Sequence, residues 1–182
     1  MLFLDSTYFQ GELYLPNLKY NIPEASGTQK RLQTVGENTL GWFIAKYEPE
    51  FMKMLLGSRL YSNFIDGMKE EYPAQVWIDL RDVIFPQGEY NLSPAANYVF
   101  YWTLRRGRTQ TSMKGEERSI SDFAMLAADK NVLVKAWNDM LNPVAAIREF
   151  IFDNWDAYKE YANGRGCVCN CGFRPINVWN LL

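Results

Sequence analysis

The sequence predicts a mainly α-helical protein, a compact bundle of about five or six helices with an extended N-terminal arm and an irregular C-terminal tail. Two observations favour this fold class. Apolar residues recur three and four positions apart over most of residues 34–162, which is the spacing of a buried helix face. Ser, Thr and Pro, which begin helices, stand before these runs, and Gly follows some of them. The chain has 182 residues, 48% hydrophobic and 22% charged, which suits one globular domain.

We divide the chain into an arm at residues 1–33, a helical domain at 34–162 and a Cys-containing tail at 163–182. Four turn-forming residues interrupt the short apolar runs of the arm: Gly11, Pro16, Pro23 and Gly27. This pattern predicts extended segments and turns rather than a helix. We expect that such an arm could add a strand to another chain.

The helical domain opens with a possible capping box, Thr34 with Glu37, before a helix through residues 40–47. Pro49 suits the first turn of a following segment that ends at Gly57. We therefore expect one interrupted or kinked helical stretch here.

Three further start signals follow. Ser58 can cap the next helix, and Pro73 can begin another. Ser93 followed by Pro94 predicts the start of an aromatic helix through residues 98–102, which we interpret as core.

Residues 107–118 are polar and without periodicity, so they predict a loop or a short hairpin. Ser119 and Asp122 have capping-box spacing before the next helix. Pro143 then restarts the chain before a last amphipathic helix through residues 147–158.

The composition bears on function. No histidine is present, which excludes Ser-His-Asp and Cys-His chemistry and the usual catalytic zinc sites. The net charge of −2 gives no overall attraction to nucleic acid or to an anionic membrane. Neither a secretory signal nor an apolar run of membrane-spanning length is found. We expect a protein that is not an enzyme, has no membrane partner and is made in the cytoplasm.

Three local patterns occur in a fixed order. They are LGWFIAKYEPEFMKMLLG at residues 40–57 followed by Leu60, Tyr61 and Phe64; ANYVFYW at residues 96–102 leading to residues 109–111 and 115–116; and KAWNDM at residues 135–140 followed by residues 147–152, Tyr158 and Tyr161. Together they resemble the small helical head-tail connector proteins, also called adaptor or head-completion proteins, of tailed phages of Bacteroides-type hosts. The resemblance covers residues 36–162.

This resemblance implies a virion protein that self-associates as a ring, a dodecamer beneath the portal. It implies contacts with the portal protein and with other neck or tail proteins, and non-specific contact with genomic DNA in the channel. The location implied is the virion, with the bacterial host cytoplasm during assembly. The alternatives are a nucleic-acid-binding or DNA-packaging accessory protein and a metal-binding protein.

The metal alternative depends on Cys167, Cys169 and Cys171, a Cys-x-Cys-x-Cys pattern that could bring three thiolates to one zinc ion. Structural zinc has four ligands, so Asp153 or Asp156, a water or a neighbouring chain would supply the fourth. Otherwise no cofactor is expected, and the cysteines are reduced thiols of the tail.

Two more groups are candidate contact residues. Arg105, Arg106, Arg108 and Lys114 are candidates for a DNA-channel or subunit contact; alternatively they are a solvated helix end with salt bridges to acidic neighbours. Trp179, Leu181 and Leu182 have no obvious helix to join, so we expect them to dock on the chain's own body or on a partner.

Overall fold

The computed structural model describes residues 1–15, 18, 39–88, 91–107, 109–112, 115–118, 130–159, 161 and 173–177. Six helices of ten or more residues lie within this part of the chain: α2 (Leu40–Leu56), α3 (Ser58–Met68), α4 (Gln75–Ile84), α5 (Pro94–Gly107), α7 (Lys130–Asp139) and α8 (Leu141–Asp153). The single turn α9 (Trp155–Tyr158) follows α8. The predicted fold class, mainly helical and arranged as a bundle, is confirmed.

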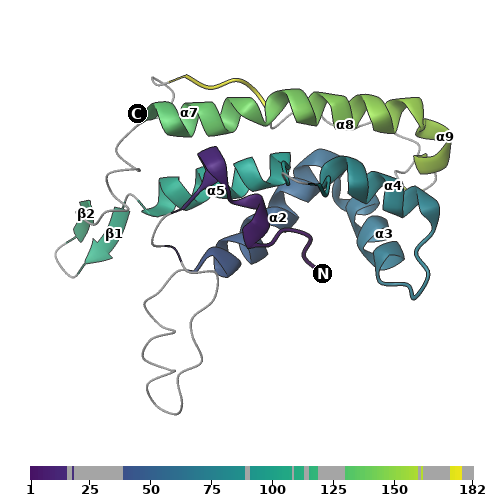
Figure 1. The fold of residues 1–182 in the computed structure, drawn as a ribbon, viewed down its shortest axis with the longest axis horizontal. Coiled ribbons are helices and arrows are strands. Elements are labelled where there is room, and N and C mark those ends of the chain that lie inside the picture. The colour runs from purple at the N-terminus through teal and green to yellow at the C-terminus, as the bar shows by residue number, and fades with distance from the viewer. Residues whose placement is uncertain are drawn as a thin grey trace, which may run out of the picture.

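The helices form two layers. Figure 1 shows α7 and α8 running end to end along one side of the molecule, with α5 and α4 beneath them. Helix α5 is central, because it contacts α2, α7 and α8. Three of its aromatic residues are buried, as predicted, namely Tyr98, Phe100 and Tyr101, whereas Trp102 is only partly buried.

Helix α2 runs through Pro49 as one continuous helix, so of the two predicted alternatives, an interrupted or a kinked stretch, the interruption is wrong. Proline lacks the amide hydrogen that a helix interior uses, and this costs stability. The helix continues because its buried face runs on both sides of the proline: Phe43, Ile44 and Tyr47 before it, and Phe51, Met52 and Leu55 after it. Thr39 caps the helix, and its hydroxyl accepts the Trp42 N–H at 3.3 Å. The capping box predicted at Thr34 and Glu37 lies outside the described residues.

Three other predicted helix starts can be compared with the structure. Ser93 caps α5 as predicted, since its hydroxyl accepts the Ala95 N–H at 3.2 Å and donates to the Ile84 carbonyl at 2.8 Å. Ser58 is the first residue of α3, but Gly57 holds the cap position and no side chain caps the helix. Helix α4 begins two residues after Pro73.

Residues 109–112 and 115–118 pair as the two strands of a hairpin, one of the two predicted alternatives. Strands β1 (Thr109–Ser112) and β2 (Gly115–Arg118) pair in antiparallel register, with Thr109 opposite Arg118. The capping residues predicted at Ser119 and Asp122 lie outside the described residues.

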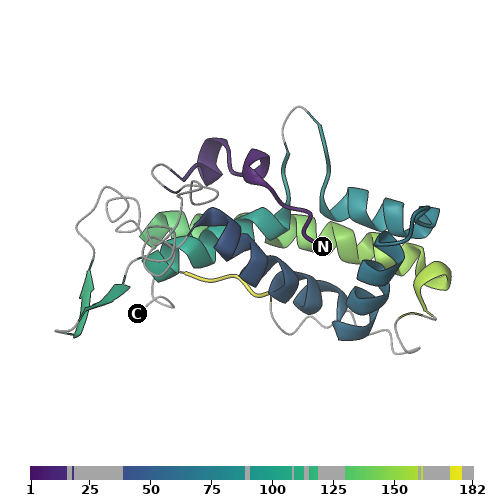
Figure 2. The same cartoon turned by 90° about the horizontal axis from the view of Figure 1, so that it is seen from below.

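The first fifteen residues contain two short turns, η1 (Ser6–Tyr8) and η2 (Gly11–Leu13), and no α-helix. They nevertheless lie on the chain's own body, which Figure 2 shows in purple against the helices. Five of their side chains belong to the core: Leu4, Tyr8, Phe9, Leu13 and Leu15. The expectation of a separate arm is therefore wrong for residues 1–15, because burying these side chains removes a large apolar area from water.

Candidate functional site

A groove lies between three parts of the chain that are far apart in sequence: the N-terminal turns, residues 91–97 and the junction of α7 with α8. Its volume is about 550 Å³, within the size range of ligand pockets. Leu13, Leu92, Pro94 and Pro143 give it a largely apolar lining. Leu92 is 70% exposed and accessible to a partner. The groove could therefore receive an apolar side chain.

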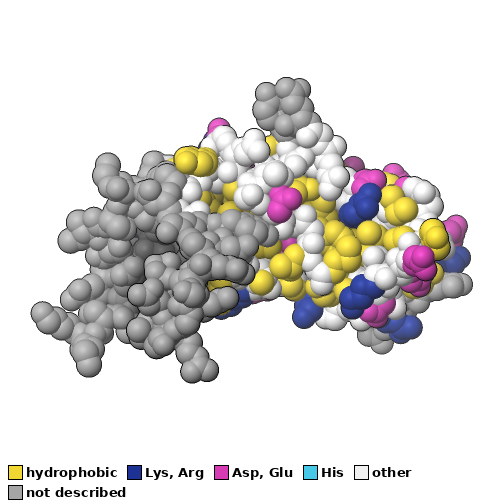
Figure 3. Space-filling view, turned by 60° about the horizontal axis from the view of Figure 1, so that its bottom comes forward, with side chains coloured by type: hydrophobic (Ala, Val, Ile, Leu, Met, Phe, Trp, Pro, Cys, Tyr) yellow, Lys and Arg dark blue, Asp and Glu magenta, His cyan; other side chains and the backbone are white. Residues whose placement is uncertain are grey.

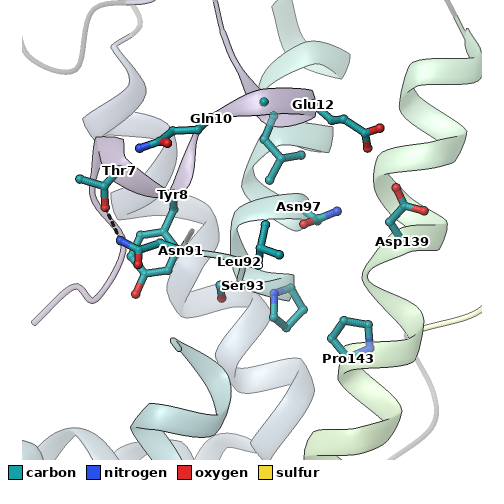
Figure 4. A pocket seen from close by; sticks show the side chains of 13 residues that line it. Thr7, Tyr8, Gln10, Glu12, Asn91, Leu92, Ser93, Asn97, Asp139 and Pro143 are labelled. Carbon is teal, nitrogen blue, oxygen red and sulfur yellow. Dashed lines mark hydrogen bonds between the residues drawn. The ribbon is translucent and has the colours of Figure 1, made fainter. Parts of the chain in front are cut away.

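The groove carries charge at one edge. Figure 4 shows the carboxylates of Glu12 and Asp139 there. The ammonium of Lys135 bonds both of them, at 2.6 Å to Glu12 and 2.8 Å to Asp139. These hydrogen bonds, that to Asp139 first, raise the pKa of Lys135 above its usual value. The three groups together carry one net negative charge, so this edge favours a partner with a basic side chain.

Two asparagines fix the walls of the groove. Asn91 donates to the Thr7 hydroxyl at 2.7 Å and accepts the Gly88 N–H at 3.0 Å, which ties the N-terminal turns to the segment before α5. Asn97 donates to the Ala136 carbonyl at 3.2 Å and so joins α5 to α7. The groove is thus formed before any partner binds.

A second polar site lies in the core. Both carboxylate oxygens of Glu48 accept backbone N–H groups, from Phe3 at 2.9 Å and from Leu4 at 2.9 Å. Burial raises the pKa of Glu48 to about 7, although the two hydrogen bonds act in the opposite direction. Sequence reasoning missed this residue. The available signal was its position, four residues after Ile44 and four before Met52, on the buried face of α2.

Two of the four predicted basic residues lie together at the end of α5. Arg105 and Arg106 are exposed, and both guanidinium groups lie over the ring of Trp102, at 5.4 and 5.8 Å from its centroid. Arg105 also donates to the Tyr101 hydroxyl. Arg108 and Lys114 lie outside the described residues. Cation–π contacts hold this pair on the surface of the body.

The predicted zinc ligands are not brought together in the described part of the chain. Cys167, Cys169 and Cys171 lie outside it, and Asp156 bonds Lys159 at 2.7 Å. No group of three or more metal-binding side chains occurs among the described residues. The zinc site therefore stays a prediction, as does docking by Trp179, Leu181 and Leu182, which also lie outside.

Large apolar side chains are exposed on several elements. Figure 3 shows hydrophobic side chains gathered across the middle of one face, with charged side chains around them. Within the described residues, the most exposed aromatic side chains are those of Tyr14, Trp42, Tyr72 and Phe152. The Lys46 ammonium lies over the Trp42 ring, 5.1 Å from its centroid. Exposed rings of this kind are typical of protein contact surfaces.

Comparison with protein-family models, with curated proteins and with solved structures gives no match. None of the described helices is both long and apolar enough to cross a membrane.

Proposed function

We propose that this protein is a structural subunit of a phage head-tail connector, a ring that joins the portal to the tail and acts by assembly without catalysis. The observation that carries the proposal is the apolar groove, together with the exposed aromatic residues elsewhere on the same chain. The sequence patterns at residues 36–162 resemble those of connector proteins and support the same reading.

A ring of identical subunits needs two different surfaces, one of which binds the other on the next subunit. The groove offers an apolar cavity with a net negative edge. The pair of Trp42 and Lys46 offers an exposed ring beside a positive charge. We propose that these two surfaces meet between neighbouring subunits in a dodecamer that binds the portal and other neck or tail proteins in the virion.

The test is the mass of the complex that the purified protein forms with the portal of its virion, by light scattering or native mass spectrometry. We expect a ring of subunits on the portal, and we expect Leu92→Asp to prevent it, because the charge would enter an apolar contact. Ser62→Asp adds the same charge to an exposed position of α3 and should leave assembly unchanged. Assembly by Leu92→Asp equal to that of the unchanged chain would exclude the groove as the contact.

The exposed pair Arg105 and Arg106 favours a second function, binding of nucleic acid as a DNA-packaging accessory protein. Two guanidinium groups can contact backbone phosphates without reading sequence. We expect double-stranded DNA to bind more weakly as salt rises, and Arg105→Ala with Arg106→Ala to reduce the slope of log affinity against log salt by about 2. Fluorescence anisotropy with a labelled duplex measures both, and an unchanged slope would count against a DNA contact.

A further inference from the structure

Residues 173–177 lie along α7 and are held through their main chain. In Figure 1 this segment is the yellow coil that runs beside α7. The side chain of Asn138 accepts the Ile176 N–H at 3.0 Å and donates to the Ile176 carbonyl at 3.0 Å. The Trp137 indole donates to the Arg174 carbonyl at 2.7 Å. An asparagine that bonds both main-chain groups of one residue acts as a neighbouring strand would, so this surface recognises extended backbone.

The same segment is anchored by one aromatic side chain. Phe173 is only 6% exposed, and its ring packs edge-on against Phe51 with centroids 5.5 Å apart. The Arg148 guanidinium lies over the Phe173 ring at 5.3 Å. Phe51, Asn138 and Arg148 belong to α2, α7 and α8, so three helices together form the site. We call it the tail groove; it consists of Phe51, Trp137, Asn138 and Arg148.

The connection to the tail groove is long. Tyr161 follows the turn α9, and its carbonyl accepts a hydrogen bond from the Asn63 side chain at 3.2 Å. Eleven residues, 162–172, join Tyr161 to Phe173. A chain of this length spans at most about 40 Å, which is of the order of a small domain's diameter. A tail groove on an adjacent copy is therefore accessible to the segment wherever it lies within that span.

We propose that the tail groove is a subunit contact, in which residues 173–177 of one copy occupy the tail groove of a second copy. Every contact described above joins the segment to the helical body, so all of them are retained when the segment comes from another chain. Such an exchange of an identical segment is a low-cost way to join subunits. The inference deepens the proposed connector function and rests on it for the ring, but its test needs no portal.

The experiment traps the exchanged segment. In a chain with Cys167, Cys169 and Cys171 replaced by serine, one preparation carries Asn138→Cys and the other carries Ile176→Cys. Each chain then has a single thiol, so a disulfide between the two positions joins two chains. We expect the oxidised mixture to contain a reducible cross-linked pair that neither preparation forms alone. Lys135→Cys, at a position of α7 that faces the N-terminal turns, is the matched control and should give no such pair with Ile176→Cys.

A chain carrying both Asn138→Cys and Ile176→Cys completes the test. A disulfide within this chain, with none in the mixture at any concentration, would overturn the proposal. A second measurement does not depend on disulfide geometry: native mass spectrometry of the unchanged protein and of Phe173→Asp across a range of concentrations. A charge at this buried anchor keeps the segment out of every tail groove, so the pair should be lost, and equal association of both chains would also overturn the proposal. If rings still form on the portal in that case, the connector function survives and only the exchange fails.

Discussion

Glu48 fastens residues 3 and 4 to α2 from a position that is only 2% exposed. A buried carboxylate is costly because it leaves water, and here only two N–H groups and the charge of the Met1 amine act against that cost. Burial raises the pKa values of Tyr8 and Tyr61, and the Glu48 charge raises both further. The N-terminal attachment is therefore sensitive to the protonation of one group.

The raised pKa of Glu48 predicts that the stability of the protein depends on pH. Its pKa is about 7 when folded and 4.5 in the reference state, so between these values the folded protein holds a proton that the unfolded chain has lost. The free energy of unfolding should therefore fall as pH rises from 4.5 to 7, by roughly 3 kcal/mol from this residue. Urea unfolding at pH 5 and at pH 7.5 measures it.

Glu48→Gln is the control for this effect. The amide does not titrate, although its NH₂ group faces a backbone N–H and one hydrogen bond is lost. The variant should be less stable at pH 5 and should lack the fall in stability between pH 5 and 7.5. A fall of the same size in the variant would assign the pH dependence to other groups.

Residue-scale prediction from sequence depended on whether the partner was local. The cap at Ser93 could be predicted because its amide partner is two residues away. The role of Glu48 could not, because its partners are backbone groups 44 and 45 residues distant. Nothing in the local sequence distinguishes such a carboxylate from one at the surface.

Helices α3 and α4 meet closely at Gly67. A β-carbon at this position would lie 2.2 Å from the Trp77 indole nitrogen and 2.3 Å from its neighbouring ring carbon. Trp77 is held in place by other rings, with the Tyr161 centroid 4.6 Å away. The glycine thus sets how closely the two helices pack.

Gly67→Ala is expected to destabilise the protein by about 1–3 kcal/mol, because overpacking outweighs the gain of about 1 kcal/mol in helix propensity. Gly88→Ala is the matched control, since a β-carbon there meets nothing within 4 Å. Urea unfolding of both variants measures the difference. A Gly67→Ala variant as stable as the Gly88→Ala variant would mean that Trp77 can move aside.

Element boundaries were predictable where one signal acted alone. The end of α2 at Gly57 and the start of α5 at Pro94 coincide with residues that favour those positions. At Pro49 two signals competed, and burial of apolar residues on both sides outweighed the local preference of proline. The sequence shows both signals but not their relative strength, which depends on packing against α5.

At the scale of the whole molecule, the helical class followed from apolar spacing, but the groove did not. Its walls come from residues near positions 7–13, 91–97 and 139–143, and only the folded chain brings them together. The attachment of residues 1–15 was likewise hidden, because short apolar runs between glycines and prolines are equally typical of a free arm.

The ion pair between Glu12 and Lys135 joins residues 123 positions apart, and its consequence concerns synthesis. A ribosome adds about 5–20 residues per second, so α7 follows the N-terminal turns by on the order of ten seconds. The Glu48 carboxylate that holds Phe3 and Leu4 is made much earlier, 44 to 45 residues after them, so the start of the chain can dock on α2 before the ion pair can close. The N-terminal turns therefore reach their native contacts in stages during synthesis, and the charged edge of the groove at Glu12 is completed only once α7 has been made.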